Sequence, residues 1–134
     1  MNKKIFVFGN EFFEGDEVPK KIAKLIIEDF KFNTKFQFDF IFAESPNEIL
    51  NAKNELIILD VVKGINEVKL LENIDDLILA NSVTCHDLDL GFYLKLMKQT
   101  GQITKVKIIG IPFGNTNYLN LKEKIEKILL NVSA

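Results

Sequence analysis

The sequence has one cysteine, Cys85, one histidine, His86, and no tryptophan. A single cysteine excludes an intrachain disulfide, which is typical of proteins that work in a reducing compartment. The polar start leads into a strand-length apolar run rather than a signal-peptide pattern, and no stretch approaches the roughly 20 apolar residues that span a bilayer. We therefore expect a soluble cytoplasmic protein without a membrane partner.

The chain also lacks an excess of charge of either sign, because 17 Lys and Arg face 19 Asp and Glu, for a net charge of −2. This balance predicts no broad basic surface and therefore no nucleic-acid partner. The lysines are scattered, and a group such as Lys20-Lys21-Lys24 is typical of a solvated helix face. With 134 residues, 47% of them hydrophobic, residues 1–134 are predicted to form a single domain.

Apolar periodicity predicts strands that alternate with helices along most of the chain. Continuous apolar runs indicate strands buried on both faces, whereas recurrence at helical spacing indicates helices that cover the sheet. The predicted strands are 4–8, 36–42, 55–61, 67–71 and 105–111, and the predicted helices are 19–30, 46–51, 87–100 and 119–130. This order predicts an α/β fold, namely a three-layer α/β/α sandwich. Its five-stranded sheet would be mostly parallel, with 67–71 as a short antiparallel edge strand.

Three side chains stand where such a sheet holds its ligands. Asp60 ends the apolar run 56–59, Asp16 lies in the loop after the run 5–8, and His86 precedes a predicted helix. In an open α/β sheet, ligands bind at the carboxyl ends of the strands. An imidazole that faces two carboxylates can hold a divalent transition metal, so the three residues are a candidate metal site.

Each of these residues also has a structural interpretation. Asp16 or Glu17 could cap the following helix, where a carboxylate favours the positive end of the dipole. Asp60 could orient a loop amide. A lone histidine such as His86 is often structural, although a position just before a helix favours the neutral imidazole that binds metals. Composition and spacing leave both interpretations open.

The order of these segments resembles the hydrogenase maturation proteases, which trim the precursor of the NiFe-hydrogenase large subunit. The resemblance covers nearly the whole chain, and its motifs occur in the family's order. They are Gly9-Asn10 followed by an acidic pair, the apolar strand into Asp60, Thr84-Cys85-His86 followed by Asp87-Leu88, and Ile108-Ile109-Gly110-Ile111-Pro112.

The resemblance implies the residues of the site. Asp16, Asp60 and His86 would contact the metal and act in catalysis, with Glu17 as the alternative to Asp16. The family's acidic position after the second strand has Glu44 as its nearest counterpart.

The resemblance also implies an activity. The protein would be an endopeptidase that removes the C-terminal extension of the large-subunit precursor after nickel insertion. Nickel would arrive with the substrate, and no tightly bound organic cofactor is expected. The compact chain is closer to archaeal members of the family, so the substrate could be a coenzyme F420-reducing hydrogenase. The enzyme itself is expected to be a monomer.

Two alternatives come from other functional classes. A phosphoacceptor receiver domain would use Asp16, Glu17 and Asp60 to hold Mg²⁺, but it needs a lysine at the end of its last strand, where this chain has Ile109-Gly110-Ile111. A flavodoxin-like binding module without catalytic activity is the second alternative.

Overall fold

A computed structural model describes residues 3–9, 17–35, 38–72, 83–84 and 87–133. The elements alternate along the chain as the sequence predicts. In order they are β1 (Lys3–Val7), α1 (Val18–Ile27), α2 (Phe30–Lys35), β2 (Phe38–Phe42), the 3-10 helix η1 (Pro46–Asn51), β3 (Asn54–Lys63), β4 (Lys69–Leu71), β5 (Val83–Thr84), α4 (Asp87–Gln99), β6 (Ile103–Pro112) and α5 (Tyr118–Ser133). None of the helices in these ranges is both long and apolar enough to cross a bilayer.

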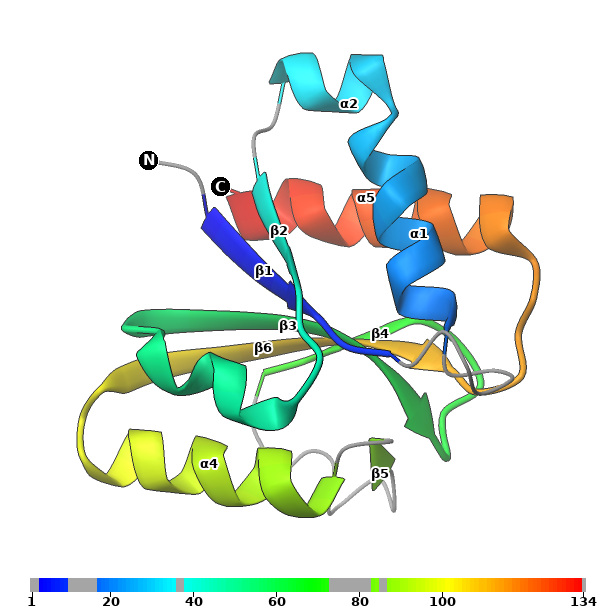
Figure 1. The fold of residues 1–134 in the computed structure, drawn as a ribbon. Coiled ribbons are helices and arrows are strands. Elements are labelled where there is room, and N and C mark those ends of the chain that lie inside the picture. The colour runs from blue at the N-terminus through cyan, green and yellow to red at the C-terminus, as the bar shows by residue number, and fades with distance from the viewer. Residues whose placement is uncertain (1–2, 10–16, 36–37, 73–82, 85–86, 134) are drawn as a thin grey trace.

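The strands form one sheet in the order β2-β1-β3-β6-β4. Strands β2, β1, β3 and β6 run parallel, and β4 runs antiparallel to β6 at the edge (Figure 1). This confirms the predicted mostly parallel five-stranded sheet and its short antiparallel edge strand. The two-residue strand β5, which pairs antiparallel with the end of β3, was not predicted.

Helices cover both faces of the sheet, as Figure 1 shows with α1, α2 and α5 on one side and α4 on the other. Successive residues of a strand point to opposite faces. Ile5 and Val7 therefore pack in the core under α1 and α5, whereas Phe6 and Phe8 pack in a second core with η1 and α4. The three-layer α/β/α sandwich is thus confirmed.

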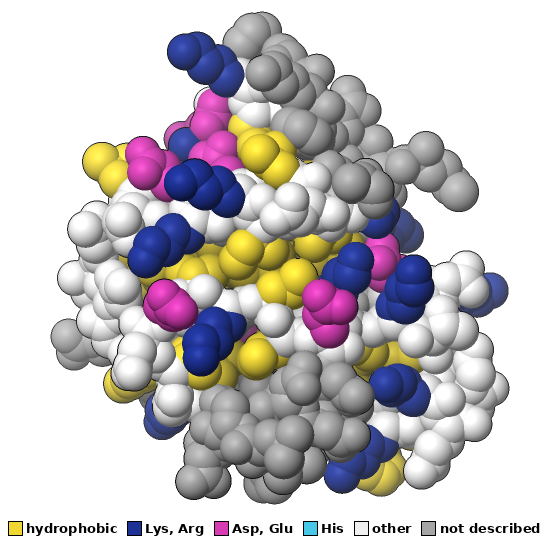
Figure 2. All heavy atoms as spheres, turned by 180° about the vertical axis from the view of Figure 1, so that it is seen from behind, with side chains coloured by type: hydrophobic (Ala, Val, Ile, Leu, Met, Phe, Trp, Pro, Cys, Tyr) yellow, Lys and Arg dark blue, Asp and Glu magenta, His cyan; other side chains and the backbone are white. Residues whose placement is uncertain are grey.

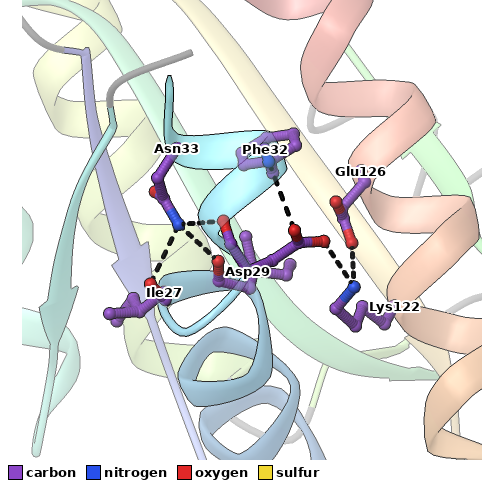
Figure 3. A network of polar contacts seen from close by, with 7 residues as sticks. Ile27, Asp29, Phe32, Asn33, Lys122 and Glu126 are labelled. Atoms are coloured by element: carbon purple, nitrogen blue, oxygen red, sulfur yellow. Dashed lines mark hydrogen bonds and ion pairs between the residues drawn. The ribbon is translucent and has the colours of Figure 1, made fainter. Parts of the chain in front are cut away.

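The predicted helix 19–30 corresponds to α1, which ends at Ile27, and a second helix that was not predicted, α2, begins at Phe30. The Asn33 side-chain amide donates hydrogen bonds to the carbonyls of Ile26, Ile27 and Asp29, which satisfies the open end of α1 (Figure 3). Asp29 then caps α2, because its Oδ1 accepts a hydrogen bond from the Phe32 backbone N–H. These local bonds end the first helix and begin the second.

Charges of both signs lie close together on the face seen from behind (Figure 2). Lys, Asp and Glu side chains lie along both sides of a band of hydrophobic side chains there. Among the side chains coloured in this view, positive charge does not gather into one broad patch, in agreement with the balanced composition.

Candidate functional site

Asp60 lies within β3 rather than at its end. The strand continues beyond Asp60 to Lys63, so the sequence-based boundary at 55–61 was too short. Strands β1 and β2 end earlier, however, because Val7 pairs with Phe42 on one side and with Leu59 on the other. Asp60 therefore lies one residue beyond the last paired row of β1 and β2, at the expected carboxyl edge of that half of the sheet, while β3 and β6 continue together to Pro112.

The Asp60 side chain is fully buried, with 0% exposure. Burial of a carboxylate is costly unless hydrogen bonds or counter-charges compensate it. Its Oδ1 accepts a hydrogen bond from the Val61 backbone N–H at 2.8 Å. Asp60 thus bonds an amide of its own strand. A buried carboxylate between apolar strands is unusual enough to mark this position as a candidate functional group.

Gly110 is the neighbour of Asp60 on β6. It lies inside β6, as the predicted strand 105–111 implies, and β6 ends at Pro112. The two residues are register partners in the parallel pair β3 and β6. A Cβ at Gly110 would lie 2.9 Å from Val62 Cγ2 and 3.1 Å from Ile65 Cδ1, so only glycine fits beside Asp60 without rearrangement.

Glu17 occupies the N-cap position of α1, but its side chain makes no capping hydrogen bond. Its Oε2 is a buried atom, and within the part of the chain that the structure describes no group donates a hydrogen bond to it. Glu17 therefore stands at the positive end of the α1 dipole, as the capping interpretation predicts, but without a capping hydrogen bond. Asp16, the first choice for this position of the site, lies outside the described residues.

His86 also lies outside the described residues, but its neighbours in the sequence are placed. Thr84, two residues before His86, pairs with Val62, two residues after Asp60. On the other side, α4 begins at Asp87, as predicted. The chain on both sides of His86 is therefore described, and the strand before it is bonded to the strand that carries Asp60.

Lys20 is a charged residue that sequence reasoning missed. It was assigned to a solvated helix face, yet it is only 4% exposed. Its Nζ lies 3.3 Å from Glu44 Oε1, and the Glu44 side chain is 85% exposed. A sequence signal did exist, because Lys20 stands one helical turn before the buried Ala23 and so shares its face.

The loop that carries Glu44 is held by a capping box at the start of η1. Glu48 Oε2 accepts hydrogen bonds from the backbone N–H groups of Glu44 and Ser45. This arrangement fixes Glu44 next to the end of β2, where Ala43 N donates to Val7 O at 2.9 Å. Glu44, the nearest counterpart of the family's second-strand acid, therefore lies at the same carboxyl edge as Asp60.

Within the described ranges, no group of three or more His, Cys, Asp or Glu residues is arranged to hold a metal ion. Two members of the predicted set, Asp16 and His86, lie outside those ranges, so the metal site stays a prediction.

Comparison with known proteins gives matches among solved structures alone. No protein-family model matches the chain, and no curated protein matches it in sequence. The hydrogenase maturating endopeptidase HybD from E. coli superposes with a TM-score of 0.71 at 17% identity, over 98% of this chain and 91% of that one.

Two further structures have similar folds. An endopeptidase from Escherichia coli matches with a TM-score of 0.65 at 17% identity, over 96% of this chain and 90% of that one. A hydrogenase 2 maturation peptidase from the Thaumarchaeota archaeon SCGC_AB-539-E09 matches with a TM-score of 0.55 at 17% identity, over 98% and 97%. The resemblance seen in the sequence is thus confirmed for the fold, and the chain has the fold of the hydrogenase maturation endopeptidases along nearly its whole length.

Proposed function

We propose that this protein is an endopeptidase that removes the C-terminal extension of a NiFe-hydrogenase large-subunit precursor after nickel insertion. The fold supports this proposal, because two solved structures with the same architecture are named hydrogenase maturation peptidases. A shared fold alone does not assign an activity. The buried Asp60 carboxylate at the carboxyl edge is the observation that carries the proposal further.

The pairing of β5 with β3 supports His86 as the partner of Asp60. Because Thr84 pairs with Val62, the chain approaches His86 from a strand bonded to the one that holds Asp60. Glu17, which directly follows Asp16, is the N-cap residue of α1 and supplies a second carboxylate at the carboxyl edge of the sheet. We propose Asp16, Asp60 and His86 as the catalytic and metal-contacting residues, with Glu17 as the alternative to Asp16.

The chemistry of this set suits a metal that arrives with the substrate. Two carboxylates and one imidazole contribute three ligands, which leaves coordination positions for groups of the precursor or for water. A nickel ion held between enzyme and precursor can polarise the scissile carbonyl and lower the pKa of a water molecule. In this proposal the nickel belongs to the substrate, and the enzyme acts in the cytoplasm as a monomer without a tightly bound organic cofactor.

The receiver-domain alternative fits the structure less well. Such a domain needs a lysine at the end of its last strand, and β6 has Ile109, Gly110 and Ile111 there.

The test of the proposed function uses a nickel-loaded large-subunit precursor and its nickel-free form. We expect the protein to shorten the nickel-loaded precursor by its C-terminal tail and to leave the nickel-free form intact, as read from intact masses. The variants Asp16→Asn and His86→Ala, checked for folding by circular dichroism, should leave both forms uncut. Precursor of unchanged length with the unaltered enzyme would favour a binding module instead.

A further inference from the structure

Lys20 and Asp60 are the two charged side chains that are buried within the described part of the chain. Asp60 belongs to the candidate site, but Lys20 has no role in the proposed reaction. Removal of an ammonium group from water costs several kcal/mol unless other groups compensate it. The ion-pair partner found for Lys20, Glu44, is largely exposed, so this pair is a poor means of stabilising the fold.

The position of Lys20 connects three parts of the carboxyl edge. It lies in the first turns of α1, one helical turn after Glu17, and therefore on the same side of the helix. Through Glu44 it reaches the loop between β2 and η1, which the Glu48 capping box holds in place. The ion pair thus ties the start of α1 to a rigid loop at the end of β2.

Glu17 is the group whose placement depends on this tie. Its Oε2 is buried, and no described group donates a hydrogen bond to it. Its backbone carbonyl accepts a hydrogen bond from Lys21 N at 3.2 Å, in the first turn of the helix. A carboxylate that makes no capping hydrogen bond, and whose buried oxygen has no donor among the described groups, moves whenever that turn moves.

We propose that Lys20 is a positioning residue of the candidate site, which acts through Glu44 to hold the first turn of α1, and with it Glu17, at the carboxyl edge of the sheet. This inference rests on the proposed function, since the site that Lys20 serves is the proposed endopeptidase site. Lys20 itself touches Glu44 and is not assigned a contact with the substrate.

The substitution Lys20→Met separates this role from simple stabilisation. Methionine fills a similar volume without charge, and because Glu44 is largely exposed the substitution removes a buried ammonium group and leaves no buried charge unpaired. We therefore expect the variant to unfold at the wild-type temperature or above it. The kcat for cleavage of the nickel-loaded precursor should nevertheless fall about tenfold or more, because small displacements of catalytic groups are costly.

Lys20→Arg keeps the charge and should restore part of the lost kcat. Glu44→Gln removes the same ion pair while it leaves the buried lysine in place. It therefore tests the same contact if Lys20→Met does not fold. Because Lys20→Met and Glu44→Gln remove the same contact, the double variant should lose no more kcat than the more impaired of the two single variants. Lys24→Met, one turn further along the exposed side of α1, is the control and should cleave like the wild type.

Amide hydrogen exchange provides a readout that does not require activity. Loss of the tie should open the first turn of α1, so the Lys21 amide should exchange about twofold to fivefold faster in Lys20→Met and Glu44→Gln, but not in Lys24→Met. Unchanged Lys21 exchange in both variants would overturn the positioning role. If the wild-type protein cleaves no precursor, the proposed function fails, and the exchange rates alone decide the role of Lys20.

Discussion

Asp60 on β3 and Gly110 on β6 are register partners in parallel strands, and a Cβ at position 110 would clash with Val62, two residues after Asp60. A methyl group at position 110 would meet Val62 Cγ2 at 2.9 Å, and Val62 is itself fully buried. In the sheet, the neighbour of Asp60 on β6 is therefore a residue that has a backbone but no side chain.

Gly110→Ala is expected to lower the free energy of unfolding by about 1–3 kcal/mol, because overpacking forces well-packed side chains to shift. Urea denaturation followed by circular dichroism measures this change. Lys105→Ala, at an exposed position on the same strand, should stay within about 0.5 kcal/mol of wild type. A Gly110→Ala protein as stable as the wild type would show that the site tolerates a side chain there.

The ion pair between Asp29 and Lys122 predicts a loss of stability in acid. Lys122 Nζ lies 2.7 Å from Asp29 Oδ2 and also contacts Glu126 (Figure 3). The hydrogen bond from Lys122, helped by the Phe32 backbone N–H, lowers the pKa of Asp29 from 3.8 to about 2. A carboxyl group whose pKa is lower in the folded state stabilises the fold at any pH above its pKa in the unfolded chain. This contribution is lost as the pH falls through its pKa in the folded state.

We therefore expect the free energy of unfolding to fall between about pH 4 and pH 2 because Asp29 becomes protonated. Burial raises the pKa of Glu126, and this shift has the opposite effect on the pH dependence of stability. Its contribution is present at low pH and is lost as the pH rises through the pKa of Glu126 in the folded state. The hydrogen bond to Asp29 raises the pKa of Lys122, so its contribution is present at neutral pH and is lost only in strong base.

The variant Asp29→Asn isolates this acid dependence. Asparagine keeps a side-chain oxygen for the Phe32 N–H, so α2 stays capped. Urea titrations at several pH values should show a shallower loss of stability below pH 4 than in the wild type. An equal slope in both proteins would assign the acid sensitivity to other carboxyl groups.

The boundary between α1 and α2 depends on Asn33. Its side chain donates to the carbonyls of Ile26, Ile27 and Asp29, at 2.7–2.9 Å. Asn33→Ala should therefore cost about 1–2 kcal/mol, as loss of a capping residue does. Asn33→Asp has nearly the same shape but no donor, so it should be at least as destabilising. Thermal unfolding of both variants and of the wild type measures these effects. A neutral effect of both substitutions would contradict the capping role.

Much of the fold could be predicted because its signals are local. Apolar runs located the parallel strands, and the helix predicted at 46–51 is η1 at the same bounds. The edge position of 67–71 followed from its short length, although the strand itself is limited to Lys69–Leu71. These features depend on neighbouring residues, so a sequence window contains the information that decides them.

The remaining differences come from contacts between distant residues. Strand β5 has two residues and exists through its pairing with β3, so no periodicity could reveal it. The break after Ile27 is held in part by Lys122, far away on α5. Lys20 is buried because α1 packs on the sheet and Glu44 lies at the end of β2. Asp60 was placed at the correct edge, but it stands inside β3 because β3 and β6 extend beyond β1.

The intact mass of a nickel-loaded large-subunit precursor, measured after incubation with wild-type protein and with Asp60→Asn, tests the central claim most directly. Asparagine keeps an acceptor for the Val61 N–H, so the variant should fold with a melting temperature near that of the wild type. The account predicts that wild-type protein removes the C-terminal tail and that folded Asp60→Asn leaves the precursor at full length. Complete cleavage by Asp60→Asn would contradict the assigned site, and a full-length precursor with the wild type would contradict the endopeptidase function itself.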